Sequence, residues 1–167
     1  MARRWPFLLV AALIAPGLAT SLAQDAATSG AHEVPYPEGF RRWAHVKSAL
    51  VGAETPGAGR YVGLHHVYAN AKALEGYQTG RFPDGAVIAF DLLDVRTENG
   101  STEEGPRKFT DVMHKDSARF ASTGGWGFQE FEGPAHARTL DHAAAVRCSG
   151  CHERRAPDDR VISSLRE

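Results

Sequence analysis

Residues 82–95 read FPDGAVIAFDLLDV, a turn signal followed by the clearest strand pattern in the chain. Proline, aspartate and glycine at 83–85 favour a tight turn, because proline presets φ, aspartate bonds the nearby backbone and glycine accepts a positive φ. The residues that follow are rich in β-branched and large apolar side chains, which pack well on a pleated sheet. The stretch therefore predicts a strand, and with it a fold that contains a β-sheet.

The segments on either side of this strand carry both helix and strand patterns. Apolar residues at 40, 43, 44 and 46 predict an amphipathic helix over 38–47. Asn70 is a suitable N-cap for a helix over 71–77, and the alanine-rich run 140–146 also fits a helix. Further strands are expected at 61–68, 108–114 and 126–131. The order of these elements predicts an α+β fold, an antiparallel sheet flanked by helices.

The last predicted helix leads into Cys148-Ser149-Gly150-Cys151-His152, which has the C-x-x-C-H pattern of covalent haem c attachment. Each thiol can add to one haem vinyl group, and His152 can then coordinate the iron as the proximal ligand. These are the only cysteines of the chain. The motif predicts one covalently attached haem c in a single domain.

Two cysteines at this spacing have three other common uses. A structural zinc site needs four ligands, and no second Cys or His pair at short spacing lies near the motif. A thioredoxin-like redox site would need a βαβ unit after the motif, whereas only 15 residues follow His152. A short-loop disulfide remains the alternative.

Residues 1–23 have the parts of a secretory signal peptide: Arg3 and Arg4, an apolar run, and small residues before Ala23. Cleavage there predicts an exported, periplasmic protein with a flexible tail over 24–34 and one domain over 35–167. Loss of the two arginines takes the net charge from −1 to −3. This mildly acidic balance gives no support for nucleic-acid binding.

Several blocks of sequence together suggest a family. They are Tyr36–Trp43 (YPEGFRRW), Phe82–Val87 (FPDGAV), Lys115–Phe120 (KDSARF), Gly124–Phe128 (GGWGF) and the C-x-x-C-H motif. In their order and spacing they resemble the cytochrome P-460 family over residues 35–153. The resemblance implies an antiparallel sheet flanked by helices, one covalent haem c, a five-coordinate iron with His152 as proximal ligand, and a homodimer.

The family has two functional branches. In one, which resembles hydroxylamine oxidases, a strand lysine is also cross-linked to the haem. The other, the cytochromes c-prime-beta, lacks this bond and resembles a binder of nitric oxide and other small gases. In the enzymes the lysine lies in the strand after the F-x-D-G turn, and by that register Phe90 takes its place here. The resemblance therefore favours the gas-binding branch, although an ordinary core phenylalanine also fits position 90.

The same register gives candidates for the distal side of the iron. Alternation along the strands places Tyr61 and His65 on one face of theirs and Phe90 on one face of its own. Tyr61 and Phe90 would crowd the sixth coordination site, and His65 and Asp111 stand where the enzymes carry polar distal residues. Each also fits an ordinary core, interface or surface residue.

Three functions follow from these expectations. The first is an exported mono-haem c-type cytochrome that binds small gases such as nitric oxide. The second is an enzyme of the cytochrome P-460 type that oxidises hydroxylamine or nitric oxide, with Asp111 or His65 taking the protons. The third is an electron carrier with a periplasmic redox partner, for which Met113 or a histidine would be the sixth ligand.

Overall fold

The computed structural model describes residues 33–156 and 158–166. The signal peptide expected over 1–23 and nearly all of the tail expected over 24–34 lie outside these residues. Val34 is fully buried, so the packed part of the chain begins no later than this residue. Among the described residues, no helix is long and apolar enough to cross a membrane.

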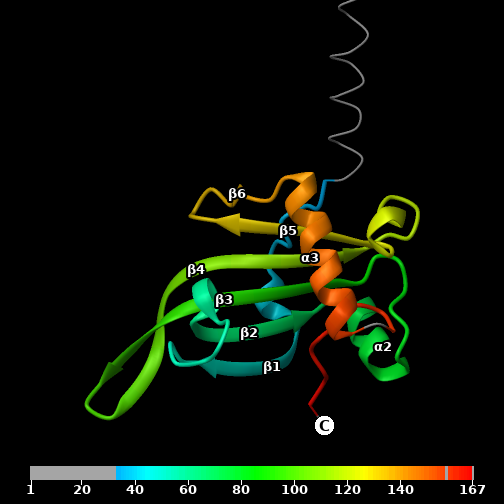
Figure 1. Ribbon diagram of the computed structural model, residues 1–167. Helices are drawn as coiled ribbons and strands as arrows, with labels where there is room; N and C mark the ends of the chain where they lie inside the picture. Colours follow the sequence, from blue (N-terminus) through cyan, green and yellow to red (C-terminus); the bar gives the residue numbers. More distant parts are fainter. Residues whose placement is uncertain (1–32, 157, 167) are drawn as a thin grey trace, which may run out of the picture. The chain divides into compact units, whose positions relative to one another are not determined.

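In the described residues the chain forms one antiparallel sheet whose strand order follows the chain, β1-β2-β3-β4-β5-β6 (Figure 1). The strands are β1 (Ala44–Val51), β2 (Gly63–Ala69), β3 (Val87–Glu98), β4 (Ser101–Lys115), β5 (Trp126–Glu132) and β6 (Ala137–Arg138). The hairpin between β3 and β4 extends well beyond the other strands. The predicted α+β class with an antiparallel sheet is confirmed.

Two α-helices, α2 (Ala71–Thr79) and α3 (His142–Arg155), and three 3-10 turns, η1 (Phe40–Arg42), η2 (Gly59–Tyr61) and η3 (Ala121–Thr123), accompany the sheet in the described part of the chain. The predicted cap of α2 is confirmed, because Asn70 Oδ1 accepts a hydrogen bond from the Ala73 backbone N at 2.8 Å. The same oxygen accepts from the Val87 N at 3.0 Å, which ties the start of α2 to β3.

The helix predicted over 38–47 is wrong. The chain makes the short turn η1 and then enters β1, which pairs with β2 from Ala44↔Ala69 to Val51↔Gly63. Backbone hydrogen bonds to a strand about 20 residues away outweigh the local helical spacing of the apolar residues. Three other predicted elements are confirmed with different bounds. The strand predicted over 61–68 begins at Gly63, and the strand predicted over 108–114 begins earlier, at Ser101. The helix predicted over 140–146 continues through the cysteine motif as α3.

Alternation along the strands gives the sheet two different faces. The helix-covered face, defined here by Ile88, Phe90, Met113 and Phe128, packs with Ala73 of α2 and with Ala145 and Cys148 of α3. The opposite face has its own apolar cluster: Val34, Val112, Phe120 and Phe131. Helix α3 crosses the helix-covered face of the sheet (Figure 1). The cysteine motif therefore lies against the apolar side chains of that face.

Candidate haem site

The three residues of the motif lie in α3 at i, i+3 and i+4, so Cys148, Cys151 and His152 share one side of the helix. Both thiols are free; Cys148 is half-buried and Cys151 is exposed. Between them, Ser149 is buried and its hydroxyl donates to the Thr123 carbonyl of η3 at 3.1 Å. This bond fixes the rotation of α3 about its axis, and with it the directions of the motif side chains.

His152 is held between the sheet and the segment that follows α3. Its ring lies 5.1 Å from the ring of Phe128, and its Nδ1 is 2.8 Å from the carbonyl oxygen of Arg160. A carbonyl oxygen only accepts, so Nδ1 carries the proton and donates it, which leaves the lone pair on Nε2. Burial lowers the pKa of His152, while the hydrogen bond to Arg160 opposes that shift. The imidazole is therefore neutral at neutral pH, with Nε2 ready to bind a metal.

These residues fit a covalently bound haem. Two free thiols one helical turn apart can react with two vinyl groups, and a neutral imidazole with its second nitrogen already bonded is the usual form of an iron ligand. Burial raises the pKa of the Cys148 thiol, and the nearby charges of Asp111 and Glu130 act in the same direction. Cys148 is thus a neighbour of the acidic residues of the sheet.

The structure brings the predicted distal residues together. The Phe90 ring lies 6.2 Å from the ring of Tyr61 and 4.7 Å from the ring of His65, each in an edge-on arrangement. His65 Nε2 donates to the Tyr61 carbonyl, and burial lowers the pKa of His65. Tyr61 lies at the end of η2 and not in the predicted strand, yet it still contacts Phe90. We call Tyr61, His65 and Phe90 the aromatic cluster.

Asp111 lies beside this cluster. It is the cross-strand partner of Phe90 on one side and of Glu130 on the other. Burial, followed by the charge of Glu130 and a hydrogen bond with it, raises the pKa of Asp111 to about 8, while Arg60 and a hydrogen bond from Tyr61 oppose the shift. Asp111 therefore keeps its proton at neutral pH, beside the buried side chain of Glu130.

Glu130 and Arg60 were missed by the sequence reading. Glu130 is 2% exposed, and its Oε1 accepts from Arg60 at 2.9 Å and from the Thr139 hydroxyl at 2.5 Å. A signal for Glu130 was present in the sequence, because it lies two residues after Phe128 and so shares the apolar face of its strand. The sequence around Arg60 held no comparable signal: Arg60 lies in the 3-10 turn η2 and bonds Glu130, which is 70 residues away in the chain.

Comparison with known proteins adds one result. Residues 37–163 match the model of the Cytochrome P460 family, a span that contains the sheet, both α-helices and the C-x-x-C-H motif. No curated protein matches the chain.

Proposed function

Because the chain belongs to the cytochrome P460 family and is therefore a haem cytochrome, we propose that it is an exported mono-haem c-type cytochrome that binds small gases such as nitric oxide. In this proposal Cys148 and Cys151 hold the haem covalently and His152 is the only protein ligand of a five-coordinate iron. The haem supplies an open coordination site and a one-electron redox couple. The residues of the chain decide what reaches that site.

The observation that carries the proposal is the aromatic cluster at the place of the cross-linking lysine. Phe90 offers no amine, and its neighbours Tyr61 and His65 are rings as well. The side-chain amines of Lys72, Lys108 and Lys115 are hydrogen-bonded elsewhere, to Asp84, Val62 and Asp159. An apolar, aromatic wall admits small uncharged ligands and disfavours larger or charged ones.

A second candidate function rests on the carboxyl pair. Oxidation of hydroxylamine releases protons, and Asp111 lies next to the aromatic cluster with a pKa raised to about 8, so that its ionised form is a stronger base than an ordinary carboxylate. This arrangement supports the enzymatic reading. The lack of a lysine on β3 speaks against it, since the cross-link is the mark of that branch.

Electron transfer alone is less well supported. It requires a sixth ligand, and Met113 is buried in the core under the helices, while His65 already donates through Nε2 to a backbone carbonyl. We also propose that the protein works in the periplasm as a homodimer. Cell fractionation and light scattering of the haem-loaded protein test these two points.

The deciding measurement is the optical spectrum of the ferrous protein, matured with haem in a periplasm, with and without nitric oxide. We expect a high-spin spectrum that changes when nitric oxide is added. A strongly red-shifted band together with turnover of hydroxylamine would overturn gas binding in favour of the enzyme. A sharp low-spin spectrum that ignores nitric oxide would leave only electron transfer.

A variant of Phe90 sharpens this test. Phe90→Ala opens the wall of the aromatic cluster and should raise the rate of nitric oxide binding about tenfold, as expected for a barrier lowered by about 1.4 kcal/mol. Phe131→Ala makes the same truncation on the opposite face of the sheet and should leave the rate unchanged. Equal rates in wild type and Phe90→Ala would remove Phe90 from the path of the ligand.

A further inference from the structure

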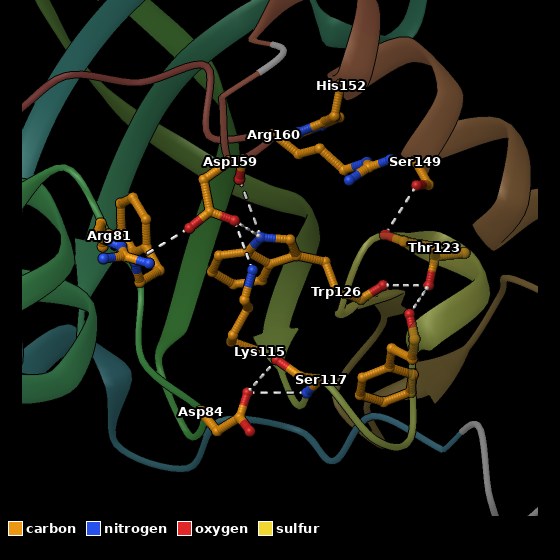
Figure 2. A network of polar contacts seen from close by, with 12 residues as sticks. Arg81, Asp84, Lys115, Ser117, Thr123, Trp126, Ser149, His152, Asp159 and Arg160 are labelled. Atoms are coloured by element: carbon orange, nitrogen blue, oxygen red, sulfur yellow. Dashed lines mark hydrogen bonds and ion pairs between the residues drawn. The ribbon is translucent and has the colours of Figure 1, made fainter.

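The segment that follows α3 is fixed by the side chain of Asp159. Its Oδ1 accepts from Lys115 Nζ at 2.5 Å and from Trp126 Nε1 at 3.1 Å, and its Oδ2 accepts from the Phe82 backbone N at 3.0 Å. The Asp159 carbonyl oxygen accepts from the same Trp126 Nε1 at 3.0 Å. Figure 2 shows the carboxylate enclosed between the lysine, the indole and the turn before β3. We call Asp159, Lys115 and Trp126 the anchor.

Two members of the anchor, Lys115 and Trp126, are buried and belong to the sheet. Trp126 is fully buried at the start of β5, and Lys115, at the end of β4, is only 9% exposed. Lys115 also lies over the Trp126 ring, with Nζ 5.0 Å from the ring centroid. A lysine is rarely buried without a partner, because removing its charge from water is costly. The carboxylate of Asp159 is that partner, so the anchor is held by charge as well as by hydrogen bonds.

The residue after Asp159 carries the atom that contacts the proximal histidine. The Arg160 carbonyl accepts from His152 Nδ1 at 2.8 Å. Arg160 has a φ of 59°, a left-handed conformation that is uncommon for residues other than glycine and persists when the surroundings enforce it. Its amide donates to the Ala156 carbonyl at 2.8 Å, and its guanidinium donates to Glu153 at 2.9 Å. The residue that carries the carbonyl is thus held by its own amide and side chain as well as by the anchor.

From this geometry we infer that Asp159 is a positioning residue for His152: it holds the Arg160 carbonyl against Nδ1 and so sets the strength of the bond between His152 and the haem iron. The inference rests on the haem attachment proposed above. A hydrogen bond from the distant ring nitrogen fixes the orientation of a metal-bound imidazole and increases its electron donation. Stronger donation favours ferric over ferrous iron and strengthens the iron–histidine bond.

Asp159→Asn tests the inference, with the exposed neighbour Asp158→Asn as the matched control. Loss of the charge loosens the anchor at Lys115 and lets the carbonyl move away from His152. We expect the covalent haem content to stay the same, the iron–histidine stretch in resonance Raman spectra of the ferrous protein to fall, and the reduction potential to rise. Loss of such outer partners weakens metal binding about 10- to 100-fold. A tenfold weakening confined to ferric iron raises a one-electron potential by about 59 mV.

A second variant changes the partner of the Asp159 carboxylate on β4 and leaves Asp159 itself unchanged. Lys115→Met keeps a long side chain of similar volume on β4 but removes the cation, and it should move both readouts in the same direction as Asp159→Asn. A stretch and a potential that equal the wild type in both variants would overturn the inference. The reduction potential remains a usable readout even if the iron proves six-coordinate.

Failure of this inference can be told apart from failure of the proposed function. If the wild type ignores nitric oxide while Asp159→Asn still shifts the potential, gas binding is wrong and the positioning role stands. If the wild type binds nitric oxide and neither variant shifts the potential or the stretch, gas binding stands and the anchor serves only the fold. Asp158→Asn should match the wild type in both cases.

Discussion

Two aspartates on neighbouring strands, Asp91 of β3 and Asp111 of β4, point to opposite faces of the sheet and meet opposite partners. Asp91 is fully buried and lies between two arginines, with Arg41 at 2.7 Å and Arg107 at 2.6 Å. Asp111 meets a second carboxyl group, that of Glu130. The same side chain therefore locks the fold on one face and holds a labile proton on the other, and the charge of the neighbours makes the difference.

Asp91→Asn should cause the largest loss of stability. It removes the charge that holds two guanidinium groups, and breaking a buried pair typically costs 3–5 kcal/mol. Both arginine side chains are partly exposed, 41% and 36%, and can regain water, so we expect a loss of about 2–4 kcal/mol in the free energy of unfolding. Urea unfolding measures it.

The control is Asp94→Asn, whose side chain is 58% exposed on the same strand. It should change stability by no more than about 0.5 kcal/mol, as surface substitutions usually do. Equal losses in the two variants would show that Asp91 contributes no more than an exposed carboxylate.

Asp111→Asn should act through pH. In the folded protein Asp111 keeps its proton to about pH 8, whereas the unfolded chain loses it near 3.8. Across this window the folded state binds more protons, so the stability of the wild type falls as pH rises from about 4 to 8. The asparagine variant lacks this slope. It should match the wild type best at the acid end and become the more stable protein above pH 8.

Denaturant unfolding at a series of pH values compares the two curves, with Asp91→Asn as the contrasting variant. Parallel curves for the wild type and Asp111→Asn would show that Asp111 has an ordinary pKa. In that case Asp111 would be only a weak base, and the raised pKa that favours the enzymatic alternative would be absent.

Arg60→Gln should have the smallest effect on stability, but it should measurably change the protonation of Asp111. Arg60 is half exposed, so losing its ion pair with Glu130 should cost less than about 1 kcal/mol. The arginine charge lowers the pKa of Asp111, so its removal should raise that pKa further. Infrared absorption of the protonated carboxyl group, followed against pH, measures this shift.

The exposed Arg96→Gln on the β3–β4 hairpin is the matched control and should leave the titration unchanged. A titration that is equally unchanged in Arg60→Gln would place the guanidinium outside the field of the carboxyl pair.

Much of this molecule could be predicted where the determining contacts are local. The cap at Asn70 bonds a residue three positions away, and the C-x-x-C-H motif lies within five residues, so both are visible in the sequence. Phe90 and Asp111, which the family resemblance had placed at the distal side of the iron, are neighbours through strand pairing. The predicted roles of these residues at the iron stay predictions.

The remainder depends on contacts across the chain. The helix expected over 38–47 gave way to pairing with β2, which no local spacing reveals. The partner of His152 is a backbone carbonyl. Every residue has one, so the sequence cannot show which carbonyl His152 bonds. Asp159 meets its lysine 44 positions earlier, so its importance shows only in three dimensions.

The strand order, in which each strand pairs with the next one in the chain, has a consequence for how the protein is made. Contacts between successive elements close short loops, and chains dominated by such contacts fold quickly. The helix with Cys148 and Cys151 comes after the six strands that the described residues form. A chain that emerges from its N-terminus can therefore complete the sheet first, and the thiols then arrive at a surface already shaped to receive them.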